Sequence, residues 1–326
     1  MSLRNRLLKL LADGDFHSGE ALGEALGISR MAVWKHIKAL RTTGVPLEIA
    51  RGKGYRLPNA LELLDGESIL AAVAATTRER LGTVEVCLEV DSTNNRLREQ
   101  AHSGLPSGTV CLAEMQHAGR GRRGRRWVSP FGANLYLSLL WRSPAGVAAL
   151  GGLSLVAGIA LMRSLRSFGV TGVGLKWPND IMASGAKLGG ILIDVLGEST
   201  GPCVAIIGIG INVAMPQTAG ATIEQPWTDL LTLTGHRRLS RNRFAALLLD
   251  ELLPLLAAFE TDGMQPYLEE WKRYDMVDGQ AVELHLPGRV IAGMACGIDA
   301  GGALLVDTGD GPRRFASGEV TLRSTA

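Results

Sequence analysis

The sequence predicts an α+β protein made of three consecutive parts, and three observations support this. Leucines at helical spacing, followed by a short hairpin, fill the first 60 residues. A long middle region mixes alternating strand segments with apolar helical ones, whereas residues 276–326 form short alternating strands with glycine turns, typical of a small β-barrel. A chain of 326 residues suits two or three domains, and we expect them at residues 1–60, 67–275 and 276–326.

The overall composition directs attention to local sites. The chain has 34 Lys+Arg against 32 Asp+Glu, so any basic binding site must be local. The four cysteines lie far apart without a Cys-x-x-Cys pair, which predicts neither a zinc site nor a disulfide framework and favours the reducing cytoplasm. Charges interleaved with leucines in the first 18 residues do not form a signal peptide. We therefore expect a cytoplasmic protein.

The first part of the chain has the pattern of a helix-turn-helix. Residues 17–45 predict a helix, a turn at Gly27 and a second helix capped by Ser29, and the hairpin that follows predicts a wing. We expect the exposed stripe of the second helix and the wing tip to contact DNA through Ser29, Arg30, Trp34, Lys38, Arg41, Arg51 and Lys53. A helical packing module with a solvated basic face is the alternative.

The middle region alternates predicted strands and helices. Strand 83–90 leads into a helix that Asp91, Ser92 and Thr93 are expected to cap, with their backbone N–H groups facing an acceptor. The other predicted strands are residues 109–116, 134–141, 174–181, 187–196 and 203–213. The other predicted helices are residues 147–168, 241–260 and 266–274.

The apolar stretch at residues 143–162 has the length of a membrane span but not its composition. It lacks charges, yet it holds four glycines, one proline and two serines. We interpret it as part of a helix buried in a globular core, and expect no membrane association.

The stretch GRGRRG, residues 119–124, has the spacing of a dinucleotide-binding loop but not its surroundings. Such a loop needs a helix behind it and an acidic residue about twenty positions further on. Here Pro130 and Gly132 are followed by an alternating strand, and no Asp or Glu occurs between Glu114 and Asp180. The surroundings therefore argue against dinucleotide binding.

Five arginines within residues 120–126 favour a glycine-hinged, mobile loop that closes over an anionic small molecule. Guanidinium groups bind phosphate through two parallel hydrogen bonds, so a phosphate-bearing ligand fits best. A segment that binds nucleic acid is a second interpretation, but the loop occurs once, between well-patterned strands. A flexible solvated loop is the third.

A second polar group follows the long helix. The stretch KWPND predicts Lys176 at a strand end and Asn179 and Asp180 in a turn, and Lys187 begins the next strand. Beside the arginine loop these groups could hold a nucleotide and its Mg²⁺, although Asn-Asp after proline is also a common turn. No G-x-S-x-G, P-loop or H-E-x-x-H motif occurs, so serine hydrolase, P-loop ATPase and zinc protease chemistry is not predicted.

Six motifs together resemble one family. In chain order they are DSTN (91–94), GRGRRGRRW (119–127), SPFGANLYLSL (129–139), KWPNDI (176–181), KLGGILI (187–193) and GIGINV (208–213). They resemble the biotin protein ligases, and with the winged helix in front the chain resembles the bifunctional ligases that also repress the biotin operon. The resemblance implies a central class II synthetase-like mixed-sheet domain and an SH3-like C-terminal barrel.

The resemblance also implies an activity. Biotin and ATP with Mg²⁺ would give biotinyl-5'-AMP, and a lysine of the biotin carboxyl carrier protein would accept the biotinyl group. A homodimer formed by the adenylate-bound protein would repress biotin synthesis genes at operator DNA. Two functions of other classes stay open: a biotin-sensing transcription factor without catalysis, and a nucleic-acid binder that uses both the wing and the arginine loop.

Site residues follow from the same resemblance. Catalytic roles are implied for Lys187, Asp180 and Arg122. Biotin binding is implied for Ser92, Thr93, Asn94, Gln116, Gly119, Arg120, Arg122 and Lys187. Nucleotide binding is implied for Arg122, Lys176, Asn179, Asn212 and Trp227, with no metal site formed by the protein alone.

Overall fold

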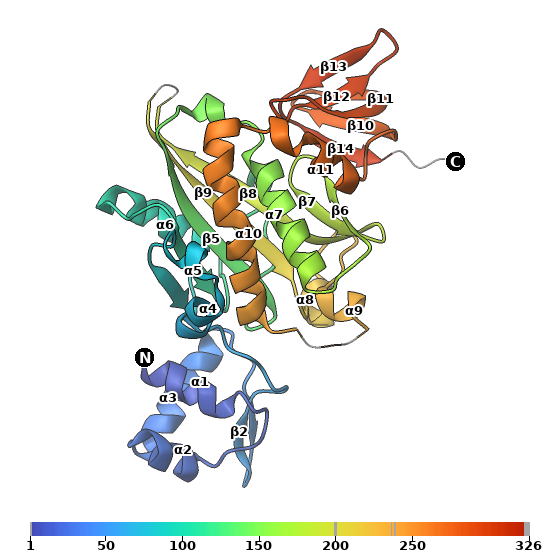
Figure 1. Cartoon of the computed structure of the whole chain (residues 1–326). Helices are drawn as coiled ribbons and strands as arrows, with labels where there is room; N and C mark the ends of the chain where they lie inside the picture. The colour runs from blue at the N-terminus through green and yellow to red at the C-terminus, as the bar shows by residue number, and fades with distance from the viewer. Residues whose placement is uncertain (1, 199–200, 236, 238, 323–326) are drawn as a thin grey trace.

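The computed structural model describes residues 2–198, 201–235, 237 and 239–322. A small front domain, a large central domain and a small all-β domain follow one another, which confirms the predicted α+β class (Figure 1). The domain boundaries given above stay a prediction.

The front domain is the predicted winged helix-turn-helix. Its elements are α1 (Leu3–Leu11), α2 (Gly19–Leu26), α3 (Arg30–Thr42), β1 (Glu48–Ala50) and β2 (Gly54–Arg56). Gly27 ends α2 in the left-handed region, with φ 70°, which glycine adopts without strain. The Ser29 hydroxyl accepts the Ala32 N–H and caps α3. The turn and the cap therefore lie where the sequence predicts them.

A seven-stranded sheet forms the centre, in the order β3-β4-β5-β9-β8-β7-β6. The strands are β3 (Val84–Cys87), β4 (Thr109–Ala113), β5 (Asn134–Ser143), β6 (Val173–Lys176), β7 (Asp180–Ala183), β8 (Ala186–Leu196) and β9 (Cys203–Asn212). β3 and β4 run parallel, and the other neighbours are antiparallel. β7 pairs with β8 only as far as Gly190, so the described part of β8 beyond Ile191 has a strand partner, β9, on one side only.

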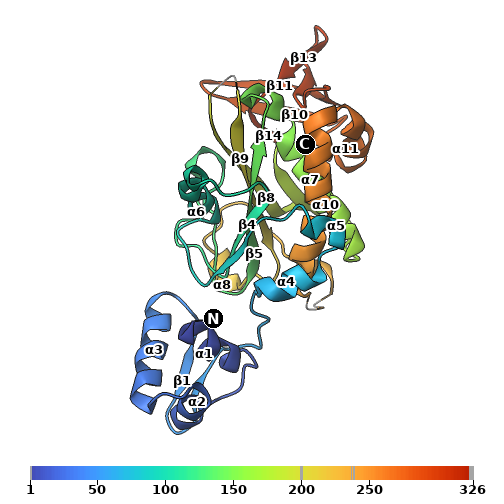
Figure 2. The ribbon, with the colours of Figure 1, turned by 60° about the vertical axis from the view of Figure 1, so that its left-hand side comes forward.

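Helices cover both faces of this sheet. α6 (Thr93–Gln100) lies on one face, whereas α7 (Leu153–Ser167) and α10 (Arg241–Asp262) lie together on the other (Figure 2). The shorter helices are α4 (Gly66–Ala72), α5 (Ala75–Arg78), η1 (Ala101–Ser103), η2 (Arg122–Gly124), η3 (Val147–Leu150), α8 (Gln217–Gly220), α9 (Leu230–Leu233), η4 (Gln265–Tyr267) and α11 (Leu268–Tyr274).

The charge-free stretch of the sequence is a core helix. By length and composition alone, residues 147–167 could cross a membrane. Gly152, with φ 84°, separates η3 from α7, and eleven residues of α7 are buried. They pack between the sheet and α10, so burial inside the protein accounts for the apolar sequence.

The last domain is an open antiparallel sheet of five strands, in the order β13-β12-β11-β10-β14. They are β10 (Ala281–Leu286), β11 (Arg289–Ile298), β12 (Leu304–Asp307), β13 (Pro312–Phe315) and β14 (Glu319–Leu322). Within the described residues no pairing joins β13 to β14, so the predicted barrel is not closed. Both edge strands have four residues, which leaves little length for a closing ladder. The arrangement is still compatible with an SH3-like fold.

Buried polar contacts fix the linker between the front and central domains. The Leu64 N–H donates to Glu114 Oε1 at 2.5 Å, and Glu62 accepts the Arg241 N–H at the start of α10 at 2.6 Å. Met115 and Phe131 of the central domain complete the hydrophobic core of the front domain. The front domain is therefore packed against the segment in which β4 leads into the arginine loop.

Candidate active site

A cavity of about 450 Å³ opens between the arginine loop, the start of α6 and strands β8 and β9. Its size suits a small ligand. Most of the predicted site residues line it: Ser92, Thr93, Asn94, Gln116, Arg120, Arg122, Asn179, Asp180, Lys187, Asn212 and Trp227. Gly119 and Lys176 do not line it. Gly119 instead permits close packing, because a Cβ there would lie 2.7 Å from Ser129 Oγ.

The start of α6 is held by a side chain from elsewhere in the chain. Ser92 is the N-cap residue, but its side chain makes no capping hydrogen bond. Instead Gln116 Oε1 accepts the Thr93 N–H at 2.9 Å, and the Asp91 carboxylate accepts a hydrogen bond from Asn95 at 2.6 Å. The predicted cap by Asp91, Ser92 and Thr93 side chains is therefore wrong, because an amide oxygen 23 positions away takes that place.

Glycines of the GIGINV strand, β9, make room for two side chains of the site. A Cβ on Gly208 would lie 2.2 Å from Asn94 Oδ1, and a Cβ on Gly210 would lie 2.7 Å from the Trp127 ring. Asn94 is held between this backbone and Ser138 of β5, whose hydroxyl donates to Asn94 Oδ1 at 2.6 Å. The spacing of the glycines thus sets where the amide and the indole lie.

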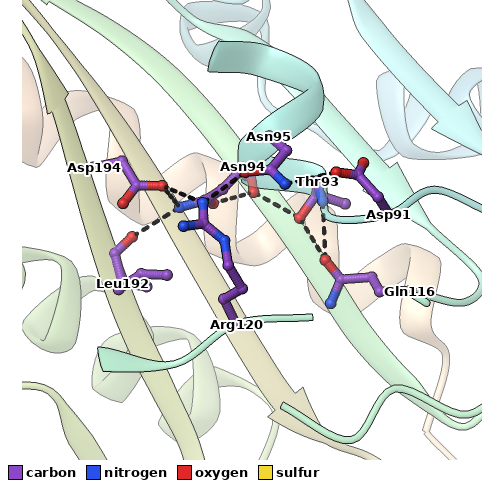
Figure 3. Close-up of polar contacts among 9 residues, drawn as sticks. Asp91, Thr93, Asn94, Asn95, Gln116, Arg120, Leu192 and Asp194 are labelled. Carbon is purple, nitrogen blue, oxygen red and sulfur yellow. Dashed lines mark hydrogen bonds and ion pairs between the residues drawn. The ribbon is translucent and has the colours of Figure 1, made fainter. Parts of the chain in front are cut away.

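Hydrogen bonds connect the start of α6 and the arginine loop to Asp194 on β8 (Figure 3). Asn94 Nδ2 and Arg120 Nη2 both donate to Asp194 Oδ2 at 3.1 Å. Arg120 Nη2 also donates to Asn95 Oδ1 at 2.6 Å. Asp194 therefore joins α6, β8 and the arginine loop, and sequence reasoning did not single it out.

The arginine loop folds over the cavity. The Gly121 N–H donates to Arg125 O at 2.7 Å and closes the short turn η2. Arg122 Nη1 donates to Asn179 Oδ1 at 3.3 Å and to Gly318 O at 3.1 Å. Burial lowers the pKa of the Arg122 guanidinium. One arginine thus joins the KWPND turn to the C-terminal domain.

Glu319, at the start of β14, is a partner of the loop that sequence reasoning missed. Its carboxylate lies 2.7 Å from Arg125 Nη1 and 3.5 Å from Arg123 Nη1. Burial opposes ionisation, but the hydrogen bond from Arg125 and the nearby arginine charges hold the pKa of Glu319 below its ordinary value. The C-terminal domain therefore helps to set the conformation of the loop.

Lys187 is the second residue of β8, and it lines the cavity together with the arginine loop. Its Nζ is 2.6 Å from Asp180 Oδ1 and 5.8 Å from the centre of the Trp127 ring, and its side chain is 13% exposed. Its backbone makes hydrogen bonds of 2.9 and 3.0 Å with residues 226–228, which brings Trp227 to the cavity wall. Burial lowers the pKa of neighbouring Lys176.

Two donors of the site have no acceptor among the described residues. They are Arg120 Nε and Trp127 Nε1, and both atoms are buried. Buried N–H groups in folded proteins nearly always have an acceptor. Together with Lys187 and Arg122, these groups make the cavity suitable for an anionic ligand with several oxygen atoms.

Two of the four free cysteines are closer than their sequence positions indicate. Parallel pairing of β3 with β4 brings the ligand atoms of Glu85, Cys87 and Cys111 within 4.8 Å of one another. Sequence spacing missed this group because the thiols belong to different strands. Both Glu85 oxygens accept hydrogen bonds from Arg96, at 2.7 and 3.2 Å, so the carboxylate already has a partner.

Known proteins match each of the three parts of the chain. Residues 3–56 match an HTH domain, residues 87–212 the Biotin/lipoate A/B protein ligase family and residues 279–323 the Biotin protein ligase C terminal domain. The bifunctional ligase/repressor BirA of Escherichia coli (strain K12) is 44% identical over 319 residues, which cover 98% of this chain and 97% of that protein. The chain belongs to the biotin/lipoate A/B protein ligase family.

Two further matches agree with this assignment of the ligase. The bifunctional ligase/repressor BirA of Bacillus subtilis (strain 168) is 32% identical, over 98% of this chain and 99% of its own. The structure of the Aquifex aeolicus biotin protein ligase in complex with biotin and ATP superimposes with a TM-score of 0.63 at 30% identity, covering 74% of this chain and 98% of that one. Both BirA matches cover the front domain as well as the catalytic domain. The ligase is therefore of the bifunctional ligase/repressor kind.

The front domain of the ligase presents the predicted DNA-binding residues at its surface. Arg30, Trp34, Lys38 and Arg41 of α3 are exposed, as are Arg51 and Lys53 of the wing. Trp34 is 44% exposed, with Lys38 Nζ 5.4 Å from its ring centre, and Arg30 pairs with Glu20 at 2.9 Å. This surface suits phosphates and base edges, and contact with DNA by these residues stays a prediction.

Proposed function

We propose that the ligase makes biotinyl-5'-AMP from biotin and ATP in this cavity and transfers the biotinyl group to a lysine of the biotin carboxyl carrier protein. The observation that carries the proposal is the position of Lys187. It lies beside Asp180 in the wall of the cavity, which also contains two buried N–H donors that have no acceptor among the described residues. We place the reaction in the cytoplasm, in keeping with four free cysteines.

In the first step a biotin carboxylate oxygen attacks the α-phosphorus of ATP. A P–O bond to biotin forms, the bond to the β-phosphate breaks, and pyrophosphate leaves with the electron pair. The attacking group is already ionised, so the protein needs no nucleophile and no general base. It needs to offset the repulsion between two anions, which Lys187 and Arg122 do as cations that both line the cavity beside the KWPND turn.

Magnesium fits the oxygen donors of the KWPND turn. Asp180 and Asn179 offer a carboxylate and an amide oxygen, which are hard ligands suited to this ion. When bound with ATP, Mg²⁺ supplies further neutralisation of phosphate charge. Asp180 also accepts a hydrogen bond from the ammonium group of Lys187. One carboxylate would therefore both bind Mg²⁺ and position Lys187.

In the second step the neutral amine of the carrier lysine attacks the acyl carbon of the adenylate. A C–N bond forms, the C–O bond to AMP breaks, and the amine loses a proton. Water would hydrolyse the mixed anhydride, so the intermediate must stay covered until the carrier arrives. The arginine loop, with its contacts to Asn179 and Gly318, supplies this cover.

Replacing Arg122 with glycine should weaken retention of the adenylate. The side chain is partly buried over the cavity, so the change removes one charge-assisted contact, which corresponds to roughly 1.5 to 3 kcal/mol. We expect faster release of free biotinyl-AMP, measured by chromatography after a single turnover. The exposed Arg80, outside the cavity, gives the control Arg80→Gly. Release at the wild-type rate would contradict the assigned role of Arg122.

Mass spectrometry of a carrier domain incubated with the ligase, ATP, Mg²⁺ and biotin tests the proposed function directly. We expect a mass increase of one biotinyl group on one lysine. Biotin-dependent exchange of pyrophosphate into ATP tests the first step separately. Absence of both activities would leave a biotin-sensing transcription factor as the better description.

The repressor role is proposed to depend on adenylate and on pairing of two chains. One front domain presents a small basic surface, so specific binding to an operator should need two copies on a two-fold site. Beyond Ile191, the side of β8 that has no strand partner among the described residues lies next to the arginine loop, where Arg120 contacts Asp194, and it supports pairing there. The same edge could dock the carrier domain, which would compete with pairing.

Biotin and ATP together should therefore increase binding of the ligase to its own upstream biotin operator, and unbiotinylated carrier domain should reduce it. Electrophoretic mobility and analytical ultracentrifugation would measure DNA binding and dimer formation under each condition. DNA binding that ignores all three additions, or a ligase that stays monomeric with adenylate at micromolar concentration, would refute this regulatory scheme.

A further inference from the structure

Asp194 ends the buried polar chain of the cavity, and no motif assigns it a role. Its side chain is 22% exposed, and it lies near the C-terminal end of β8, beyond Ile191. A single oxygen, Oδ2, accepts from both Asn94 Nδ2 and Arg120 Nη2 at 3.1 Å (Figure 3). One carboxylate therefore holds a side chain of α6 and a side chain of the arginine loop at the same time.

We propose that Asp194 is a positioning residue, which sets Asn94 and Arg120 in the orientations that retain the biotinyl adenylate. The proposal rests on the proposed function of the cavity. Asp194 would act through these two side chains and would not itself touch the reacting atoms.

For Asn94, the Asp194 carboxylate and the Leu192 carbonyl together decide which way the amide faces, since Nδ2 donates to both, at 3.1 and 3.4 Å. An ionised carboxylate only accepts hydrogen bonds, so the Nδ2 group must point to Asp194 and the oxygen must point to Ser138. The amide cannot move away, since the backbone at Gly208 leaves no room for even a Cβ beside Asn94 Oδ1. An amide at position 194 could donate as well as accept, so only the weaker contact with Leu192 O would then favour this orientation of Asn94.

For Arg120, the carboxylate decides where the remaining donors point. Nη2 is bound by Asp194 and by Asn95 Oδ1, at 3.1 and 2.6 Å. Because the guanidinium is planar and rigid, fixing Nη2 also fixes the direction of Nε. Nε is buried and has no acceptor among the described residues, as expected of a donor reserved for a ligand oxygen.

The same contact fastens the first half of the arginine loop to the sheet. Arg122, Arg123 and Arg125 hold the second half through the KWPND turn and the C-terminal domain. Without Asp194, the one side-chain partner that Arg120 keeps among the described residues is Asn95, which belongs to α6. We therefore expect the intermediate to escape faster, with less effect on the rate of its formation.

The test compares full-length wild-type ligase with Asp194→Asn, which has nearly the same shape but no charge. Release of biotinyl-AMP should become about ten- to a hundredfold faster, the range expected when a charge-assisted hydrogen bond is lost. The single-turnover rate of adenylate formation should change by less than about threefold, because Lys187 and Arg122 remain. Asp194→Glu should restore most of the retention, and Glu198→Gln, just beyond β8, should change nothing.

A double-mutant cycle with Arg120→Ala shows whether Asp194 acts through Arg120. The double variant should release adenylate little faster than Arg120→Ala alone, because interacting residues are not additive. Additive effects, wild-type release by Asp194→Asn, or a large loss of its melting temperature would overturn the proposal. A wild-type ligase that forms no adenylate would instead refute the proposed function, and this inference with it.

Discussion

Replacing Lys187 with alanine should slow adenylate formation by about thirty- to a thousandfold, equivalent to roughly 2 to 4 kcal/mol of transition-state stabilisation. Lys187 Nζ is the cation at the β8 wall of the cavity, and its side chain is largely shielded from water. Its attraction for the carboxylate and the α-phosphate grows as the two anions approach. Pre-steady-state formation of biotinyl-AMP, with saturating biotin and ATP, would measure the change.

Folding should be spared by this substitution, since Lys187 keeps its backbone contacts with residues 226–228. Lys272→Ala, which removes an exposed lysine from α11, is the matched control and should leave adenylation unchanged. Asp180→Asn should also weaken adenylation, because it loosens Lys187 and removes the carboxylate proposed to hold Mg²⁺. Near-normal adenylate synthesis by well-folded Lys187→Ala would remove Lys187 from the active site.

Local patterns marked part of the cavity in the sequence, and the family resemblance supplied the other site residues. Helix caps, glycine loops and strand starts carry recognisable residue types, and Ser92, Arg122, Asn179 and Lys187 all occupy such positions. The helix-turn-helix was predictable for the same reason, since Gly27 and Ser29 mark a turn and a cap. These features depend on neighbours in the sequence.

The partners that hold the site could not be predicted in this way. Asp194 and Glu319 are single acidic residues in ordinary strands, and they meet Arg120 and Arg125 over separations of 74 and 194 residues. Only strand order and register bring such pairs together, and neither can be read from residue spacing. The open edge of the C-terminal sheet was missed for a related reason, because alternation indicates strands but not whether they close a barrel.

Glu114 lies in a segment that contacts both the cavity and the front domain. It follows β4 directly and precedes Met115, which packs into the core of the front domain, and Gln116, which holds the start of α6. Its Oε1 accepts the Leu64 N–H of the linker. Residues 114–116 therefore contact the start of α6, the linker and the front domain. We expect the position of this segment to depend on the balance of the Glu114 charge.

Replacing Arg241 with methionine should lower the free energy of unfolding by about 3 to 5 kcal/mol, because a buried charge would lose its partner. Arg241 and Glu114 are only 4% and 3% exposed, and Arg241 Nη2 lies 2.9 Å from Glu114 Oε2. The two groups are not aligned as a hydrogen bond, so Oε2 depends on the charge of Arg241. Urea unfolding followed by tryptophan fluorescence and circular dichroism would measure the loss.

Removing the charges of both Arg241 and Glu114 shows why Arg241→Met loses stability. The cause is either the unpaired Glu114 carboxylate or the lost packing of the Arg241 side chain. Arg241→Met with Glu114→Gln keeps an acceptor for the Leu64 N–H and leaves no buried charge, so the double variant should recover much of the lost stability. Arg30→Met breaks the ion pair with Glu20, whose side chains are 71% and 69% exposed, and should change stability by less than about 1 kcal/mol. A double variant no more stable than Arg241→Met would show that packing and the other hydrogen bonds of Arg241, to Asn134 and Glu62, dominate its contribution.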